Sequence, residues 1–133
     1  MTDSTSLRTQ YGGVLSFSIR SRTTRESKFE ISCAQSGFSG KRIVSSYVVG
    51  TPDSLFKDMA ANWKGWPGEK TWHDLERVAV LACSMDSTGH AWLKVTLTDH
   101  DKEARLETKL MFEAGELDAL STKVSKLFSH RDA

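Results

Sequence analysis

Alternating hydrophobic and polar positions mark the first half of the chain and predict strands. Leu15, Phe17 and Ile19 share one face of their segment, with serines at the positions between them, as in a half-buried strand. The same period of two recurs further along the sequence. Strands are therefore predicted at residues 14–20, 28–34 and 42–49. Residues 1–13 show no periodicity, so we expect a flexible tail there.

A helix is predicted to follow the third strand. Thr51 is a suitable capping residue, Pro52 fits the first helical position, and Asp53 complements the positive end of the helix dipole. An apolar stripe with helical spacing comes next, formed by Leu55, Phe56, Met59, Ala60 and Trp63. Gly65 and Pro67 are expected to end the helix. We expect every member of the stripe, the tryptophan included, to be buried.

The second half of the chain repeats this order of elements. Strands are predicted at residues 75–85, 91–97 and 106–112, and a closing helix carries Leu117, Leu120, Val124, Leu127 and Phe128 on one face. The order is then βββα followed by βββα; similarity of pattern alone does not establish a duplication. Short connections favour antiparallel neighbours. The sequence thus predicts a single α+β domain over residues 14–133, with an antiparallel sheet of about six strands and two helices on one face.

Composition narrows the function classes. The chain has 133 residues, of which 38% are hydrophobic and 26% charged, and its formal net charge is +1. This balance is typical of a soluble globular protein and gives no electrostatic argument for nucleic acid or for an anionic membrane. Neither a signal peptide nor an apolar run of membrane-spanning length is found, so a cytoplasmic location is expected. Cys33 and Cys83 lie in apolar runs and are interpreted as buried thiols.

Candidate catalytic chemistry is sparse. The four histidines lack the ligand spacing of a zinc site, and no nucleotide- or cofactor-binding loop is present, so neither a metal nor a cofactor is expected. The best acid-base group is His73 with Asp74 and Glu76, next to Trp72. Because no nucleophile or oxyanion motif completes this group, the sequence favours a protein that is not an enzyme.

Tryptophans supply the strongest signal for a binding surface. Three of the four fall within residues 63–72. The fourth, Trp92, is out of phase with Ala91 and Leu93, so a period of two turns it toward the opposite face of its strand. Exposed aromatic residues amid mixed charge are typical of protein contact surfaces. The predicted partner-binding residues are Trp66, Trp72, His90, Trp92 and Lys94. The alternative is that the chain's own termini or a loop cover this second face.

Four motifs carry a family resemblance over about residues 28–128. They are Trp63-x-Gly65-Trp66-x-Gly68, Trp72-x-x-Leu75-Glu76, Asp86-x-x-Gly89-His90 and Glu113-Ala114-Gly115-Glu116-Leu117. Together they resemble a family of small uncharacterised bacterial proteins. The chain is also similar, more loosely, to the small α+β immunity proteins that accompany polymorphic or contact-delivered bacterial toxins. Neither resemblance implies catalytic residues, and the near-neutral charge departs from the acidic character expected of many nuclease inhibitors.

The resemblance implies a cytoplasmic immunity protein that binds a cognate toxin and neutralises it by one-to-one occlusion. Two alternatives from other classes stay open at this point. One is a small hydrolase that uses His73, Asp74 and Glu76, and the other is a structural or regulatory interaction module without catalysis. The sequence names neither the toxin nor its activity, and it leaves the oligomeric state open.

Overall fold

Two successive ββββα units make up the part of the chain that the computed structural model describes, residues 3–101 and 103–129. The first unit contains β1 (Ser4–Arg8), β2 (Val14–Arg22), β3 (Ser27–Gln35), β4 (Phe38–Ser45) and α1 (Asp53–Ala61). The second contains β5 (Lys70–His73), β6 (Ala79–Met85), β7 (His90–Thr98), β8 (Arg105–Glu113), the 3-10 turn η1 (Ala114–Glu116) and α2 (Leu117–Ser129).

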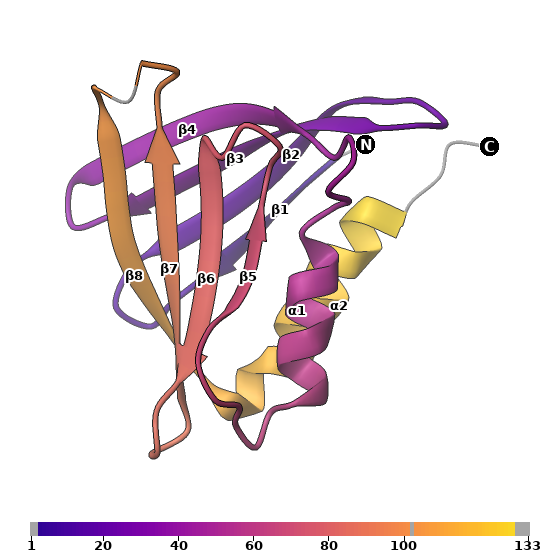
Figure 1. Ribbon diagram of the computed structural model, residues 1–133. Coiled ribbons are helices and arrows are strands. Elements are labelled where there is room, and N and C mark those ends of the chain that lie inside the picture. Colours follow the sequence, from indigo (N-terminus) through magenta and orange to yellow (C-terminus); the bar gives the residue numbers. More distant parts are fainter. Residues whose placement is uncertain (1–2, 102, 130–133) are drawn as a thin grey trace.

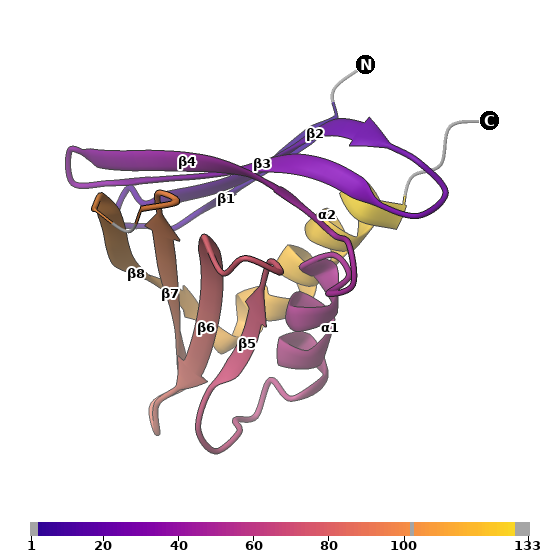
Figure 2. The ribbon, with the colours of Figure 1, turned by 45° about the horizontal axis from the view of Figure 1, so that its top comes forward.

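Each unit forms its own antiparallel sheet. Sheet A has the strand order β1-β2-β3-β4 and sheet B the order β5-β6-β7-β8. Within each sheet every connection is therefore a hairpin between neighbours, as expected where the loops are short. Figure 1 shows the two helices packed side by side next to β5. Figure 2 shows sheet A as a layer above sheet B and the helices, with its strands running across those of sheet B.

The predicted α+β class, the antiparallel pairing and both helices are confirmed, but the single sheet of about six strands is wrong. Within the described residues there are two four-stranded sheets. The prediction missed β1 because only Leu7 is buried in that edge strand, so Ser4–Arg8 has no apolar alternation. Of the expected tail, residues 1–2 lie outside the described residues. The prediction missed β5 because its four residues follow a glycine- and proline-containing stretch that indicated a bend.

Two predicted strands also have different ends. The strand expected at 75–85 begins only at Ala79, because a tight turn at Asp74 occupies the preceding residues. The strand expected at 42–49 is β4, which ends at Ser45. Val48 has a positive φ of 69°. A β-branched residue rarely adopts that conformation, which is incompatible with an extended strand.

The core lies where the two sheets and the helices meet. Phe17 of β2 packs edge-on against Phe56 of α1, with ring centroids 6.2 Å apart, and against Phe128 of α2 at 5.8 Å. Phe29 of β3 lies 4.9 Å from Phe128 and 6.0 Å from Trp72 of β5. These aromatic contacts join sheet A to both helices and to sheet B. The two layers are thus held together by one continuous apolar cluster.

Trp63 does not belong to this core, contrary to the prediction from the helix stripe. The helix α1 ends at Ala61, and Asn62 follows as its C-cap. The stripe therefore ends at Ala60, which packs partly buried against the core, and the Trp63 side chain is 54% exposed. The periodicity was extended one turn too far because an aromatic residue at the expected spacing follows the true end of the helix.

Both cysteines are buried free thiols, as predicted. Burial raises the pKa of Cys33 to about 11. Burial, with a smaller contribution from the charge of Glu69, raises the pKa of Cys83 to about 12. Neither thiol has the partly exposed, electropositive surroundings that make a cysteine reactive.

Candidate functional site

The outward face of β7 carries the most distinctive polar arrangement in the described residues. Ala91, Leu93 and Val95 point inward and are fully buried, so strict alternation turns His90, Trp92 and Lys94 outward, as the sequence predicts. Trp92 is 37% exposed. On the same face its cross-strand neighbours are Ser84 of β6 and Met111 of β8. Neither neighbour is among the residues predicted from the sequence to bind a partner.

This face is open only along its first half. Thr96 and Thr98 also point outward from β7, yet both are buried. Thr96 is flanked by Val80 of β6 and Glu107 of β8, whose side chains share its face. The solvated part of the face is thus the end that carries His90, Trp92 and Lys94.

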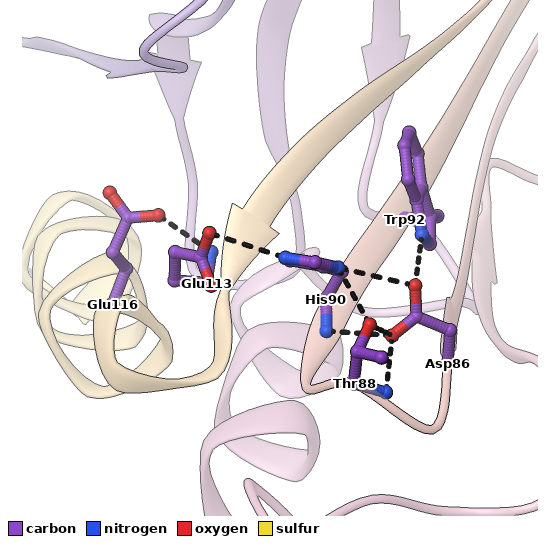
Figure 3. A network of polar contacts seen from close by, with 6 residues as sticks. All are labelled: Asp86, Thr88, His90, Trp92, Glu113 and Glu116. Atoms are coloured by element: carbon purple, nitrogen blue, oxygen red, sulfur yellow. Dashed lines mark hydrogen bonds and ion pairs between the residues drawn. The ribbon is translucent and has the colours of Figure 1, made fainter.

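The carboxylate of Asp86 accepts hydrogen bonds from three residues at this end of the sheet. Asp86 opens the β6–β7 hairpin, and its Oδ1 accepts hydrogen bonds from the main-chain N–H of Thr88 (2.9 Å), the hydroxyl of Thr88 (2.7 Å) and the main-chain N–H of His90 (3.0 Å). Its Oδ2 accepts the indole N–H of Trp92 at 3.0 Å. Figure 3 shows these contacts converging on one carboxylate. An aspartate that bonds main-chain groups two and four residues ahead stabilises a tight turn.

The same contacts determine the charge of Asp86. The hydrogen bond from Trp92, followed by those from His90 and Thr88, holds the pKa of the Asp86 carboxyl well below its usual range. A carboxylate that stays ionised is a stronger acceptor than a neutral acid. The turn and the orientation of the indole are therefore coupled through one charged group.

His90 lies between two carboxylates. Its Nδ1 is 3.4 Å from Oδ2 of Asp86, and its Nε2 is 3.4 Å from Oε1 of Glu113 on β8. Glu113 is in turn the N-cap of η1, where its side chain and that of Glu116 form a capping box. The main-chain N–H of Glu113 donates to Oε2 of Glu116 at 2.8 Å. The network thus links the β6–β7 hairpin to the start of α2 (Figure 3).

The three tryptophans of residues 63–72 occupy different environments: Trp63 is exposed, Trp66 is half-buried and Trp72 is buried. Trp66 is half-buried, its indole N–H donates to the carbonyl of Cys83 at 3.1 Å, and Lys70 Nζ lies 5.5 Å from its ring centroid. Trp72 is only 5% exposed and donates to the carbonyl of Gly50 at 3.1 Å. The expected surface role of Trp72 is therefore corrected, because a buried indole presents no area to a partner.

The structure brings together three of the five residues predicted to bind a partner. His90, Trp92 and Lys94 share one strand face, and Lys94 Nζ lies 4.0 Å from a carboxylate oxygen of Glu69. Trp66 lies in the connection before β5, where its ring packs on the core. Sequence reasoning missed Asp86 and Thr88 as site residues. The signal was the Asp-x-Thr-Gly-His spacing, which indicated only a turn.

The residues predicted as an acid-base group, His73, Asp74 and Glu76, lie in and beside the turn between β5 and β6. Asp74 is 3% exposed; its Oδ1 accepts the Ala79 N–H at 2.8 Å, and its own N–H donates to the Ala79 carbonyl at 3.2 Å. The ring Nδ1 of His73 lies 2.9 Å from the Asp74 carbonyl oxygen. Glu76 is exposed in the same turn. These contacts close the β5–β6 hairpin, and they do not arrange the three side chains around a common point.

Two further features bear on the classes of function. Over residues 3–101 and 103–129, no three or more His, Cys, Asp or Glu side chains converge as a metal site would require. Neither α1 nor α2, the α-helices of that part of the chain, combines the length and apolar character needed to cross a bilayer.

Comparison with known proteins places the fold and the family. The chain is similar to a protein in the solved structures titled "Crystal structures of trypanosoma bruciei MRP1/MRP2", with a TM-score of 0.53 and 13% identity over 96% of this chain and 84% of the other. At that identity the likeness concerns the fold alone. No curated protein sequence matches the chain. A family profile matches residues 6–131, in agreement with the expected uncharacterised family, and the chain therefore belongs to DUF6228, a family of unknown function.

Proposed function

We propose that the chain is a protein-binding protein without catalytic activity, and that its partner is a protein toxin, which it neutralises by one-to-one occlusion. The observation that carries the proposal is the outward-facing Trp92, whose indole is held by Asp86 at 3.0 Å. Tryptophan is enriched among the residues that dominate binding energy at protein interfaces. The toxin as partner rests on the resemblance of the sequence motifs to immunity proteins.

The fixed indole supports binding for an energetic reason. Ordering a free side chain at an interface costs about 0.5 to 1.5 kcal/mol, and an indole already held by a hydrogen bond avoids part of that cost. The partly exposed ring also keeps apolar area that a partner can remove from water. Its surroundings are polar and of mixed charge, with Lys94 and Glu113 nearby on the same face. An apolar anchor inside a polar rim is the usual anatomy of a protein interface.

The alternative hydrolase receives no support from the geometry. Its central group, Asp74, is buried and bonded to the main chain of Ala79. A regulatory interaction module without a toxin stays compatible with the same face. The choice between a toxin partner and another protein partner therefore depends on experiment.

The experiment is a neutralisation assay with the toxin encoded next to this gene in its source genome. The toxin is expressed alone and together with the chain, and growth is followed. We expect the chain to restore growth, and the two purified proteins to elute as a one-to-one complex in size-exclusion chromatography with light scattering. Persistent toxicity at equal expression, the lack of a complex, or the lack of any neighbouring toxin gene would each contradict the immunity function.

A further inference from the structure

A groove of about 600 Å³ lies between the edge of sheet A and the connection from β5 to β6, away from the Trp92 network. One wall comes from β3, β4 and the residues around them, including Glu26, Ile43 and Tyr47. The other wall comes from the β5–β6 connection, through Asp74, Leu75 and Glu76. Its size is within the range of ligand-binding clefts.

The β4 wall offers unpaired main-chain groups. Among the described residues β4 pairs with β3 alone, so it is an edge strand. The Ser46 N–H donates to the Ser27 carbonyl at 2.9 Å, so Ser27 and Ser46 are a hydrogen-bonded pair at the end of the β3–β4 ladder. Because hydrogen-bonded and non-bonded pairs alternate in an antiparallel ladder, the main-chain groups of Ser45 and Ile43 face away from β3. Both residues line the groove.

The groove also exposes apolar side chains from both walls. Ile43, Tyr47 and Leu75 are each more than half exposed, the first two from β4 and the residues directly after it and the third from the β5–β6 connection. A single exposed apolar side chain is ordinary on a protein surface, whereas several around one concave surface indicate a contact site. An exposed edge strand with apolar neighbours is, in addition, a ready template for another extended chain.

The charge around the groove is unbalanced. Two exposed carboxylates, of Glu26 and Glu76, line it together with one ammonium, of Lys28, and the buried carboxylate of Asp74, which accepts the Ala79 N–H, adds a further negative charge beneath it. Over residues 3–101 and 103–129, none of these carboxylates lies within 4.0 Å of a basic nitrogen in an ion pair. The complementary occupant is therefore basic as well as apolar.

We propose that this groove binds an extended segment of a partner protein, in which apolar and basic residues alternate, as a fifth strand added to β4. Successive side chains of such a strand point to opposite faces of the sheet. One set would cover Ile43, which is on the outer face of sheet A. The other set would point toward Glu76, whose β5–β6 connection lies below sheet A in Figure 2. The inference goes beyond the toxin proposal, because it concerns a different surface and does not need a toxin.

The first test measures whether the chain binds a fluorescein-labelled short peptide that alternates valine and lysine. We expect saturable binding by fluorescence anisotropy at low ionic strength. A peptide that alternates valine and glutamate should bind more weakly by a factor of about ten or more. Leu75→Ala and Glu76→Gln should each weaken binding of the lysine peptide several-fold. Tyr11→Ala and Glu103→Gln, exposed residues outside the groove, are the matched controls and should leave binding unchanged.

The second test asks whether the peptide binds as a strand. Amide hydrogen exchange, followed by NMR, should slow at Ile43 and Ser45 when the peptide is added. A peptide N-methylated at every residue, which has no N–H donor on either edge, should not bind. Equal effects of the control and groove variants, unchanged exchange at both amides, or indifference to N-methylation would overturn the proposal. Self-association of the chain that is abolished by Leu75→Ala would also overturn it, because the occupant would then be a second copy. Trp92→Ala should leave peptide binding intact, which separates this test from that of the toxin proposal.

Discussion

Two tryptophans nine residues apart provide a direct test of the packing. Trp72 is buried against Phe29, and Trp63 is more than half exposed just after α1. An aromatic side chain of this kind buries about 200 Å², which corresponds to roughly 5 kcal/mol at about 25 cal/mol per Å² as an upper estimate. Loss of the hydrogen bond to the Gly50 carbonyl adds about 1 kcal/mol.

Trp72→Ala should therefore lower the free energy of unfolding by about 3 to 5 kcal/mol, a large part of the total for a domain of this size. Trp72→Phe keeps a buried ring but loses the hydrogen bond and part of the volume, so we expect about 1 to 3 kcal/mol. Trp63→Ala should cost less than about 1 kcal/mol, since the side chain loses little packing.

The assay is urea unfolding followed by far-UV circular dichroism, because replacing a tryptophan changes the fluorescence signal itself. The Phe variant provides the measured value if the Ala variant fails to fold. An equal cost for Trp63→Ala and Trp72→Phe would contradict the placement of the two side chains, and a negligible cost for Trp72→Phe would contradict the core described above.

Three further predictions follow from single contacts. Because folding lowers the pKa of Asp86, its ionised form stabilises the fold at pH values above the unfolded pKa of about 3.9. The melting temperature of wild type should therefore exceed that of Asp86→Asn by its full amount at neutral pH, and the difference should shrink as the pH falls below about 3.9. A difference that stays constant down to about pH 2 would contradict this reasoning. Gly13→Ala should cost about 1 to 3 kcal/mol, because its Cβ would lie 2.6 Å from the Gln35 and Leu110 side chains, whereas Gly115→Ala, which meets nothing within 4 Å, should be close to neutral in the same unfolding assay. Cys33 and Cys83 should react with a thiol reagent only as the protein unfolds, and prompt labelling of the native protein would show that a thiol is accessible.

The elements that were predicted correctly are those whose buried side chains recur at the regular spacing of a strand or a helix. The strands with strict alternation, such as β2 and β8, and the helix α2 with its apolar stripe are all found close to their predicted positions. The edge strand β1 was missed because one buried leucine is too little for a period of two. The division into two sheets was missed because β4 and β5, which α1 separates along the chain, do not pair, and no local pattern records which strands pair.

The candidate site was predictable only in part. The outward direction of His90, Trp92 and Lys94 follows from the period of a strand and is confirmed. The role of Asp86 depends on the hairpin geometry that brings its carboxylate to the indole six residues further on, so spacing alone indicated only a turn. Trp72 was misassigned because its neighbours in sequence are polar and its burial comes from sheet A and from Gly50 across the core.

The proposal that the Trp92 face binds the toxin is tested most directly by the affinity of Trp92→Ala for that toxin. Isothermal titration calorimetry on wild type, Trp92→Ala and the exposed control Trp63→Ala gives the comparison, with the melting temperature as a check on folding. We expect Trp92→Ala to stay folded and to lose about 2 kcal/mol or more of binding free energy, roughly 30-fold in Kd, while Trp63→Ala binds normally. A folded Trp92→Ala variant with unchanged affinity would contradict the claim, and so would a variant that unfolds, because Trp92 would then be part of a second core.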